Sequence, residues 1–290
     1  MPVTQKVFKK IEPFLYLIPS ALILIMFTYY PFGKSFLQSF FIVDNFGKAK
    51  EFVALENYAA VLGNSRFIRA IGNTLLYVIV TVPISISVGL LLALLAQKRT
   101  RTSTIYEAMY ALPMAMSMSV VAMIYQLALN PNLGVINKFF QTTNNWLREE
   151  KTAFLWLMII QVWLNIGFDF LFTLSALRGV SDEVLESAEL DGAIGFKKLT
   201  KIILPLVSPT ILFLLVSSIA KAMIAGGLTM ILTQGGPNGS TETIVSFLYN
   251  QAVVSGKYNT GYAATIVGFI LSFMLVLLSF IYEKKGVYYD

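Results

Sequence analysis

The sequence contains no cysteine and no histidine, and only 13% of its 290 residues are charged. Because these side chains are absent, the chain can form no disulfide, no cysteine- or histidine-ligated metal site and no histidine-based acid–base catalyst. A typical soluble domain carries about 25% charged residues. This chain has too few charges to cover a water-facing surface of its size, so its composition excludes a soluble domain.

Long apolar runs take the place of the missing charges, since 56% of the residues are hydrophobic. A helix needs about 20 apolar residues to cross a hydrocarbon core about 30 Å thick. The runs are continuous rather than alternating in segments of about ten residues, which favours helices over a β-barrel. We therefore predict an all-α, polytopic membrane protein that forms a single transmembrane domain over residues 1–290. About six helices are expected to span the membrane, near residues 14–32, 73–96, 107–129, 153–177, 206–232 and 261–282.

The first and fifth spans each have a feature that bears on this interpretation. The run from Phe14 to Phe32 follows a basic segment, as in a signal peptide. It is long enough to span, however, and no small-residue cleavage site follows it, so we predict an uncleaved first helix. In the fifth span, the pair Gly226-Gly227 could break the helix.

The basic residues predict the orientation of the chain. The net charge is +6, and basic residues that flank membrane spans explain it without a nucleic-acid partner. Six spans place both termini on one side of the membrane. Lys and Arg are denser in the short segments on that side than in the opposite loops, so both termini are expected to be cytoplasmic. The inner segments are 1–13, 97–106, 178–205 and 283–290.

The loop 178–205 is long for a cytoplasmic connection and reads as two short helices. Ser181 is a plausible N-cap of the first helix, and Gly192 suits its C-terminal turn. Apolar residues recur with helical spacing from Phe196 onward, and Pro205 is expected to mark the return to the membrane. On periodicity alone, a solvated connector with an interfacial helix is the favoured interpretation of this segment.

The residues of this loop carry a more specific pattern. Glu186-Ser187-Ala188 is followed after three residues by Gly192, and after nine more by Ile202-Ile203-Leu204-Pro205. This resembles the EAA motif of permeases in binding-protein-dependent ABC importers, with Ser187 in place of the first alanine. The resemblance covers nearly the whole chain and is to the sugar-uptake branch of the type I importers. Further matching elements are Phe52–Tyr58, Gly134–Asn137, Thr233–Pro237 and Gly261–Ala264.

The resemblance implies a transport subunit that works with partners. The expected partners are a second homologous permease, two ATP-binding cassette subunits, an extracellular solute-binding protein, a sugar and the lipid bilayer of a bacterial or archaeal cell membrane. The residues implied in coupling to the ATPase are Glu186, Ser187, Ala188, Asp191, Gly192, Leu204 and Pro205. Gly226-Gly227 stand where the family often has Phe-Asp, so no role of that pair is carried over.

ATP chemistry is expected to lie in the partner rather than in this chain. A phosphate-binding loop needs the pattern GxxxxGK[ST], whose backbone N–H groups surround the phosphates. The only Gly-Lys-Ser is Gly33-Lys34-Ser35, which lacks the earlier glycine because position 28 is Thr28. We therefore predict no enzymatic activity, no metal and no cofactor in this chain.

Two ionisable residues, Asp169 and Lys221, fall inside predicted spans. A charge at the centre of a bilayer costs about 2.5–3.5 kcal/mol on insertion scales, so such residues usually face a cavity or a partner. They could pair with each other or line the substrate pathway. Gln161, Asn165 and Asp169 share one helix face, because they are four residues apart. This polar stripe, with Lys221, is the candidate pathway, and helix packing through Asn165 is the alternative.

Other functions remain open from the sequence. A permease of the same superfamily could instead import an anionic sugar or glycerol phosphate, an interpretation that Lys221 favours. A stand-alone secondary transporter would need internal repeats and a coupling-ion site, and the EAA-like loop would have no role in it. An intramembrane enzyme is disfavoured by the absence of histidine, cysteine and a paired-carboxylate motif.

Overall fold

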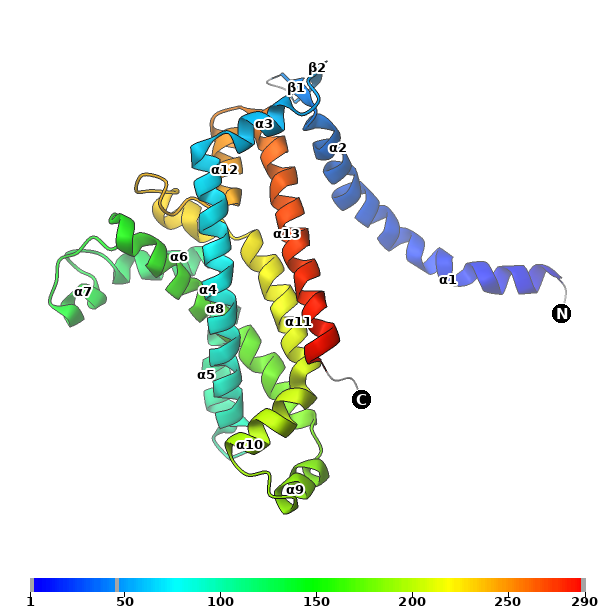
Figure 1. The fold of residues 1–290 in the computed structure, drawn as a ribbon, viewed down its shortest axis with the longest axis vertical. Coiled ribbons are helices and arrows are strands. Elements are labelled where there is room, and N and C mark those ends of the chain that lie inside the picture. Colours follow the sequence, from blue (N-terminus) through cyan, green and yellow to red (C-terminus); the bar gives the residue numbers. More distant parts are fainter. Residues whose placement is uncertain (1–2, 45–46, 288–290) are drawn as a thin grey trace. The chain divides into compact units, whose positions relative to one another are not determined.

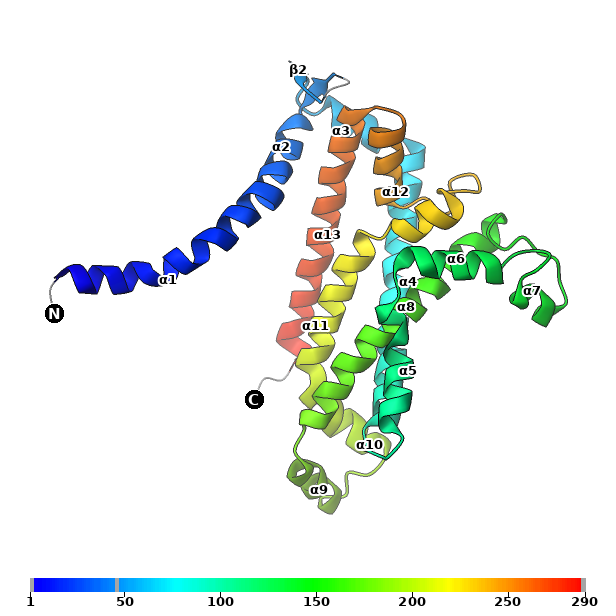
Figure 2. The same cartoon turned by 180° about the vertical axis from the view of Figure 1, so that it is seen from behind.

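The computed structural model describes residues 3–44 and 47–287, and helices make up most of this part of the chain. The exception is a hairpin of two antiparallel strands, β1 (Phe41–Val43) and β2 (Ala49–Phe52), with Phe41 opposite Phe52. The prediction of an all-α polytopic protein is confirmed. Figures 1 and 2 show the ribbon from two opposite sides. The chain divides into two compact units.

The first unit contains the described residues up to Gly63 together with Leu248–Val267. Its first helix α1 (Val3–Leu24) continues through a π-helical turn, η1 (Ile25–Tyr29), into α2 (Tyr30–Gln38). The hairpin, α3 (Glu56–Leu62), the π-helical turn η4 (Asn250–Val254) and the beginning of α13 (Tyr258–Gly286) complete this unit.

One buried amide organises the first unit. The Asn57 side-chain nitrogen donates to the carbonyl oxygens of Ser39 and Phe41, at 2.9 and 3.0 Å. The side chain of Asn259, at the start of α13, donates to the Asn57 side-chain oxygen at 3.3 Å. Asn57 thus holds the turn after α2 and the start of α13 to α3.

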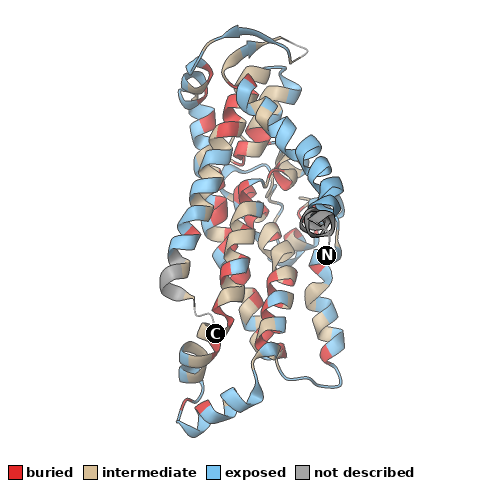
Figure 3. Ribbon diagram, turned by 90° about the vertical axis from the view of Figure 1, so that its right-hand side faces the viewer, coloured by how far each residue is buried: buried red, intermediate tan, exposed pale blue. Residues whose placement is uncertain are grey.

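The second unit contains Asn64–Phe247 and the rest of α13. Within it, α4 packs against α8 and α11, and α5 packs against α8. Gly89 allows the close approach of α4 to α8, because a Cβ at this position would lie 2.7 Å from the Asp169 Cβ. Each of these helices contains buried residues, and Figure 3 colours the ribbon by burial. The elements are α4 (Ser65–Ala96), α5 (Ser103–Ala115), α6 (Met118–Ala128), α7 (Val135–Phe140), α8 (Glu150–Gly179), α9 (Asp182–Leu190), α10 (Phe196–Lys198), η2 (Leu199–Ile203), α11 (Leu204–Met223), η3 (Thr229–Thr233) and α12 (Ile244–Tyr249).

Among the described residues, five helical runs are long and apolar enough to cross a membrane, and α5 with α6 would make a sixth. This fits the predicted number of about six. The five runs are Phe14–Gln38, Ser65–Ala96, Glu150–Gly179, Phe196–Met223 and Tyr258–Ile281.

The third predicted span, 107–129, is not one straight helix. The axes of α5 and α6 differ in direction by 98°. Pro113 has no N–H to donate to the helix ladder near the end of α5. Ser117 then caps α6, because its hydroxyl oxygen accepts from the Val120 N–H at 3.3 Å. Proline and a new N-cap therefore divide a segment whose apolar run is continuous.

The fifth predicted span, 206–232, is shifted toward the N-terminus. One helical run extends from Phe196 to Met223 through the π-helical turn η2. Pro205 lies in the first turn of α11, where its missing N–H is tolerated, so the second helix of the loop is not separate from the span. After Met223 the helix ends, and Gly226 packs so closely that a Cβ would lie 2.7 Å from a Val245 methyl carbon. The break covers residues 224–226, and helical structure resumes at Gly227, the second residue of the glycine pair.

Candidate coupling loop and translocation face

Helix α9 carries the EAA-like residues and follows directly after α8. Its N-cap is Ser181, which makes no side-chain capping hydrogen bond, while Asp182 and Glu183 place negative charge in the first turn. At the other end the Ala193 N–H donates to the Ala188 carbonyl at 2.9 Å. Gly192 has φ +78°, a left-handed conformation that glycine adopts at little cost. The prediction that Gly192 ends this helix is confirmed.

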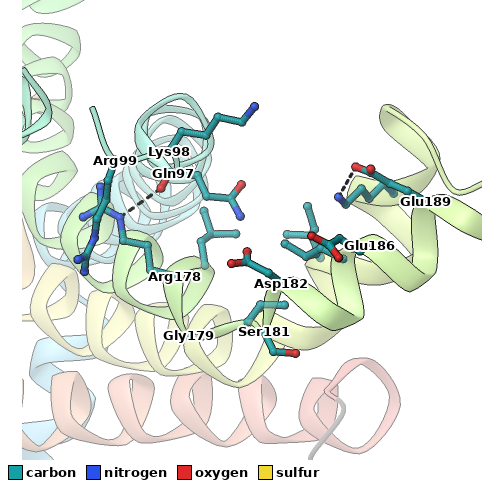
Figure 4. Close-up of a pocket in the computed structure, with 14 residues that line it drawn as sticks. Gln97, Lys98, Arg99, Arg178, Gly179, Ser181, Asp182, Glu186 and Glu189 are labelled. Carbon is teal, nitrogen blue, oxygen red and sulfur yellow. Dashed lines mark hydrogen bonds and ion pairs between the residues drawn. The ribbon is translucent and has the colours of Figure 1, made fainter. Parts of the chain in front are cut away.

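One face of α9 borders a cleft of about 710 Å³. Figure 4 shows Asp182, Glu186 and Glu189 along α9 on one side, with Lys98 and Arg99 on the other. The cleft therefore separates an acidic wall on α9 from a basic wall on the segment that follows α4. Glu186 is exposed here, where it can accept hydrogen bonds from a basic group.

The opposite face of α9 borders a smaller hollow of about 360 Å³, which Ser187, Ala188 and Asp191 help to line. Ser187 and Asp191 are exposed, but Ala188 is only 7% exposed. The methyl group of Ala188, one of the residues implied in coupling, therefore packs within the loop.

The turn around Gly192 exposes apolar side chains that the sequence analysis did not assign to coupling. Leu190, Ile194 and Phe196 are 90%, 73% and 79% exposed, and we call them the loop patch. Exposed patches of this kind mark contacts with other proteins or with membranes. The sequence does contain a signal for the loop patch, namely a group of large apolar residues that stand beside a glycine outside the predicted spans.

An ion pair closes the loop on itself. The Lys198 ammonium group lies 2.7 Å from a Glu189 carboxylate oxygen, which joins α10 to α9. This contact holds the pKa of the Glu189 carboxyl below its usual range. Leu204 and Pro205, the last residues implied in coupling, are half-buried in the helical run of α11 rather than on α9.

The polar residues of α8 form a hydrogen-bonded chain with α4. The Tyr77 hydroxyl donates to the Gln161 side-chain oxygen at 3.0 Å, and the Gln161 side-chain nitrogen donates to the Asn165 oxygen at 2.9 Å. Gln161 and Asn165 are half-buried, whereas Tyr77 is buried. These amides therefore contribute to helix packing and still keep part of their surface accessible.

Asp169 and Lys221 lie on different sides of α8. Asp169 is fully buried beside Gly89 of α4. Lys221 is exposed, and its ammonium nitrogen lies 3.6 Å from the centre of the Phe168 ring. Successive residues of a helix point about 100° apart, so neighbouring positions on α8 face different surroundings. No ion pair joins Asp169 and Lys221 in the described structure.

Lys221 belongs to a wider aromatic surface formed by α8 and α11, which we call the aromatic face. Phe172 packs on Phe213 with ring centroids 5.2 Å apart, and Phe168 lies 4.4 Å from Phe172. Phe172 and Phe213 are 41% and 48% exposed. Asn165 is one helical turn from Phe168 on α8. The face thus combines a cation, aromatic rings and an amide.

A second polar assembly fixes the loop between η3 and α12 to the start of α4. Glu242 is fully buried and accepts two hydrogen bonds from Arg66, at 2.5 and 2.7 Å. The Asn73 side-chain nitrogen donates to the carbonyl oxygens of Gly239, Ser240 and Glu242. Part of this loop matches family patterns in the sequence, but its contacts are not predictable there, because Arg66 and Glu242 are far apart in the chain.

Residues 57–284 match the family of binding-protein-dependent transport system inner membrane components. The chain belongs to this family. The family resemblance inferred from the sequence is confirmed, and with it the function of a permease with several membrane-spanning helices. A binding-protein-dependent system is not a stand-alone secondary transporter, so that alternative is set aside.

Individual relatives of this permease align over nearly their whole length. It is 29% identical over 284 residues to the sn-glycerol-3-phosphate transport system permease protein UgpA of Agrobacterium fabrum, covering 97% of each chain. It is also 29% identical to the probable ABC transporter permease protein YurN of Bacillus subtilis, covering 96% of this chain and 97% of that protein.

A solved structure shares the fold of this permease. The structure is of a bacterial ABC transporter involved in the import of the acidic polysaccharide alginate, with a TM-score of 0.85 and 22% identity. The match covers 98% of this chain and 99% of the compared chain. A second structure, the alginate transporter in complex with an alginate pentasaccharide-bound periplasmic protein, matches with a TM-score of 0.81 at 22% identity over 94% and 96% of the two chains.

Proposed function

We propose that this permease forms one half of the translocation pathway of an ATP-driven importer. Its expected partners are a second homologous permease, two ATPase subunits and an extracellular solute-binding protein. Family membership supports this assembly, as does the exposure of Glu186, Ser187 and Asp191 on a helix outside the candidate spans. In this proposal α9 and the loop patch dock on an ATPase subunit, and Gly192 lets the chain turn at that contact.

We further propose that the solute is a hydroxyl-rich compound of the sugar class that carries a negative charge. The observation that carries this proposal is the exposed ammonium group of Lys221 above the Phe168 ring. Two names among the similar proteins point the same way, since sn-glycerol 3-phosphate and alginate are both anionic and rich in hydroxyl groups.

The residues around Lys221 suit such a solute. Ammonium groups form charge-assisted hydrogen bonds with phosphate and carboxylate oxygens. Asn165 and Gln161 offer amide groups to hydroxyls, and ligand sites combine such polar groups with aromatic surfaces. Asp169 is fully buried beside Gly89 of α4, so it serves helix packing in this proposal rather than contact with the solute.

Replacing Lys221 by glutamine is expected to raise the KM for an anionic solute about 10-fold or more, because hydrogen bonds to charged groups contribute about 1.5–3 kcal/mol. Lys221→Arg should keep most of the affinity. The measurement is uptake of glycerol 3-phosphate by the reconstituted importer, with glycerol and maltose as neutral competitors. Lys138→Gln, which removes an exposed cation from α7, is the matched control.

Two results would contradict this solute assignment. One is an unchanged KM in Lys221→Gln, and the other is uptake of neutral sugars only by the wild-type importer. In both cases, ATP-driven uptake of a neutral solute would still support the proposed assembly of two permeases, two ATPase subunits and a binding protein.

We also propose that both termini are cytoplasmic and that residues 235–260 are external, as the distribution of basic residues predicts. The chain has no cysteine of its own, so single engineered cysteines can be labelled selectively. Asn238→Cys should react with a membrane-impermeant maleimide in intact cells, whereas Ile194→Cys should react only after the membrane is opened. Both positions are exposed. The reverse pattern would overturn this orientation.

A further inference from the structure

Arg178 joins the inner ends of three helices in the second unit. Its guanidinium group donates to the two carboxylate oxygens of Glu107 on α5, at 2.6 and 3.3 Å. It also donates to the Ala96 carbonyl at 2.9 Å and to the Gln97 carbonyl at 3.3 Å, at the C-terminal end of α4. We call this set of contacts the Arg178 clamp, and Figure 4 shows its contact with Gln97 at the base of the cleft.

The chemical groups of the Arg178 clamp fix the directions of its hydrogen bonds. Carbonyl groups at a helix C-terminus lack partners within the helix and carry partial negative charge, so a cation is favoured there. A guanidinium group is planar and donates in fixed directions, which sets the angles between the groups that it joins. The side chains of Arg178 and Glu107 are each only 21% exposed. The clamp therefore fixes the relative orientation of α4, α5 and α8 more firmly than an exposed ion pair would.

The clamp lies next to the start of the coupling helix. Arg178 is in the last turn of α8, and only Gly179, Val180 and Ser181 separate it from α9. Beside it, Leu185 of α9 packs against a buried apolar cluster that includes Ala96 of α4 and Leu177 of α8. A displacement of α9 would thus act on the inner end of α8 through a short link and through packed side chains.

We propose that Arg178 is a positioning residue that transmits displacement of α9 to α4 and α5. This inference rests on the proposed docking of α9 on an ATPase subunit. The helices α4 and α5 are consecutive and are joined by residues 97–102. Because Arg178 of α8 contacts the end of α4 and Glu107 of α5, both helices would move together with α8. Loss of the clamp would let α9 and α8 move while α4 and α5 stay behind.

The test uses the complete reconstituted importer with Arg178→Lys and, separately, Glu107→Gln. Lysine keeps the charge but cannot reach the carboxylate and both carbonyls at once, whereas glutamine keeps the shape of residue 107 but removes its charge. The quantities measured are ATPase co-purification, ATP hydrolysis without binding protein, and the number of ATP molecules hydrolysed per solute imported. Arg101→Lys is the matched control, since Arg101 is exposed in the segment between α4 and α5.

We expect both variants to retain the ATPase and its basal hydrolysis while the ATP used per imported solute rises about 10-fold, in keeping with the loss of charge-assisted hydrogen bonds. Arg101→Lys should match the wild type. Unchanged coupling in either assembled variant would overturn the inference. So would a fall in complex yield that accounts for the whole loss of transport in both variants, because that result identifies a purely structural ion pair. A wild-type complex that binds no ATPase would instead refute the proposed function.

Discussion

Replacing Glu186 by lysine together with Leu190 by aspartate is expected to release the ATPase subunit and to abolish ATP-driven uptake. Glu186 is exposed on the acidic side of the cleft, and Leu190 is the most exposed residue of the loop patch. In the proposed complex Glu186 pairs with a basic group of the ATPase. Loss of one partner of a buried, hydrogen-bonded charge pair at an interface costs about 2–5 kcal/mol, which corresponds to a loss of affinity of about 30-fold or more. A charge in place of an exposed leucine removes apolar contact and adds a desolvation cost.

The structure changes how this experiment is best designed. Ala188 is also implied in coupling, but it is only 7% exposed, and Ala188→Asp would disturb the packing of α9 itself. Leu190→Asp alters the surface without entering the packed side of the helix. The measurement is ATPase co-purification from detergent, with hydrolysis in reconstituted vesicles as a second reading.

The control for this experiment makes the same charge reversal, from glutamate to lysine, elsewhere. Glu51→Lys in β2 reverses an exposed charge on the side of the membrane that is expected to be external. It should leave ATPase co-purification unchanged. Recovery of the ATPase at the wild-type level with Glu186→Lys/Leu190→Asp would show that α9 is only a connector.

The sequence predicted the number and approximate places of the spans because apolar length is a local property. It did not predict the bend between α5 and α6, since the apolar run continues through Pro113 and Ser117, and proline occurs within several other helices of this chain. It also placed the end of the fifth span too late. That end depends on the packing of Gly226 against Val245, which no local pattern records.

In the candidate site, too, the sequence predicted the local features but not those that depend on packing between helices. The EAA-like spacing correctly located a helix that ends just before Gly192, because glycine readily adopts the left-handed conformation that often follows a helix C-terminus. The burial of Ala188 depends on how α9 rests on its neighbours. The contact of Lys221 with Phe168, rather than with Asp169, depends on the rotation of α8 about its axis. Periodicity shows which residues share a face, but it does not show which helix that face meets.

Replacing Arg66 by methionine is expected to lower the free energy of unfolding by about 3 kcal/mol, the lower end of the range for breaking a buried ion pair. The reason is that Glu242 is fully buried, so loss of Arg66 leaves a carboxylate with a large desolvation cost and two fewer donors. The lower end applies because the Arg66 side chain is 51% exposed and its charge is partly screened by water.

The measurement is the melting temperature of the purified permease in detergent, with Arg69→Met as the matched control. Arg69 is exposed one turn further along α4 and makes a hydrogen bond only to the Asn238 carbonyl among the contacts described for it. Its loss should therefore cost about 1 kcal/mol or less. The double variant Arg66→Met/Glu242→Met should regain much of the stability lost in Arg66→Met, since removing the Glu242 carboxylate also removes its desolvation cost. If Arg66→Met melts at the same temperature as Arg69→Met, the pair does not hold the loop, and the three carbonyl contacts of Asn73 must be sufficient to fix it on α4.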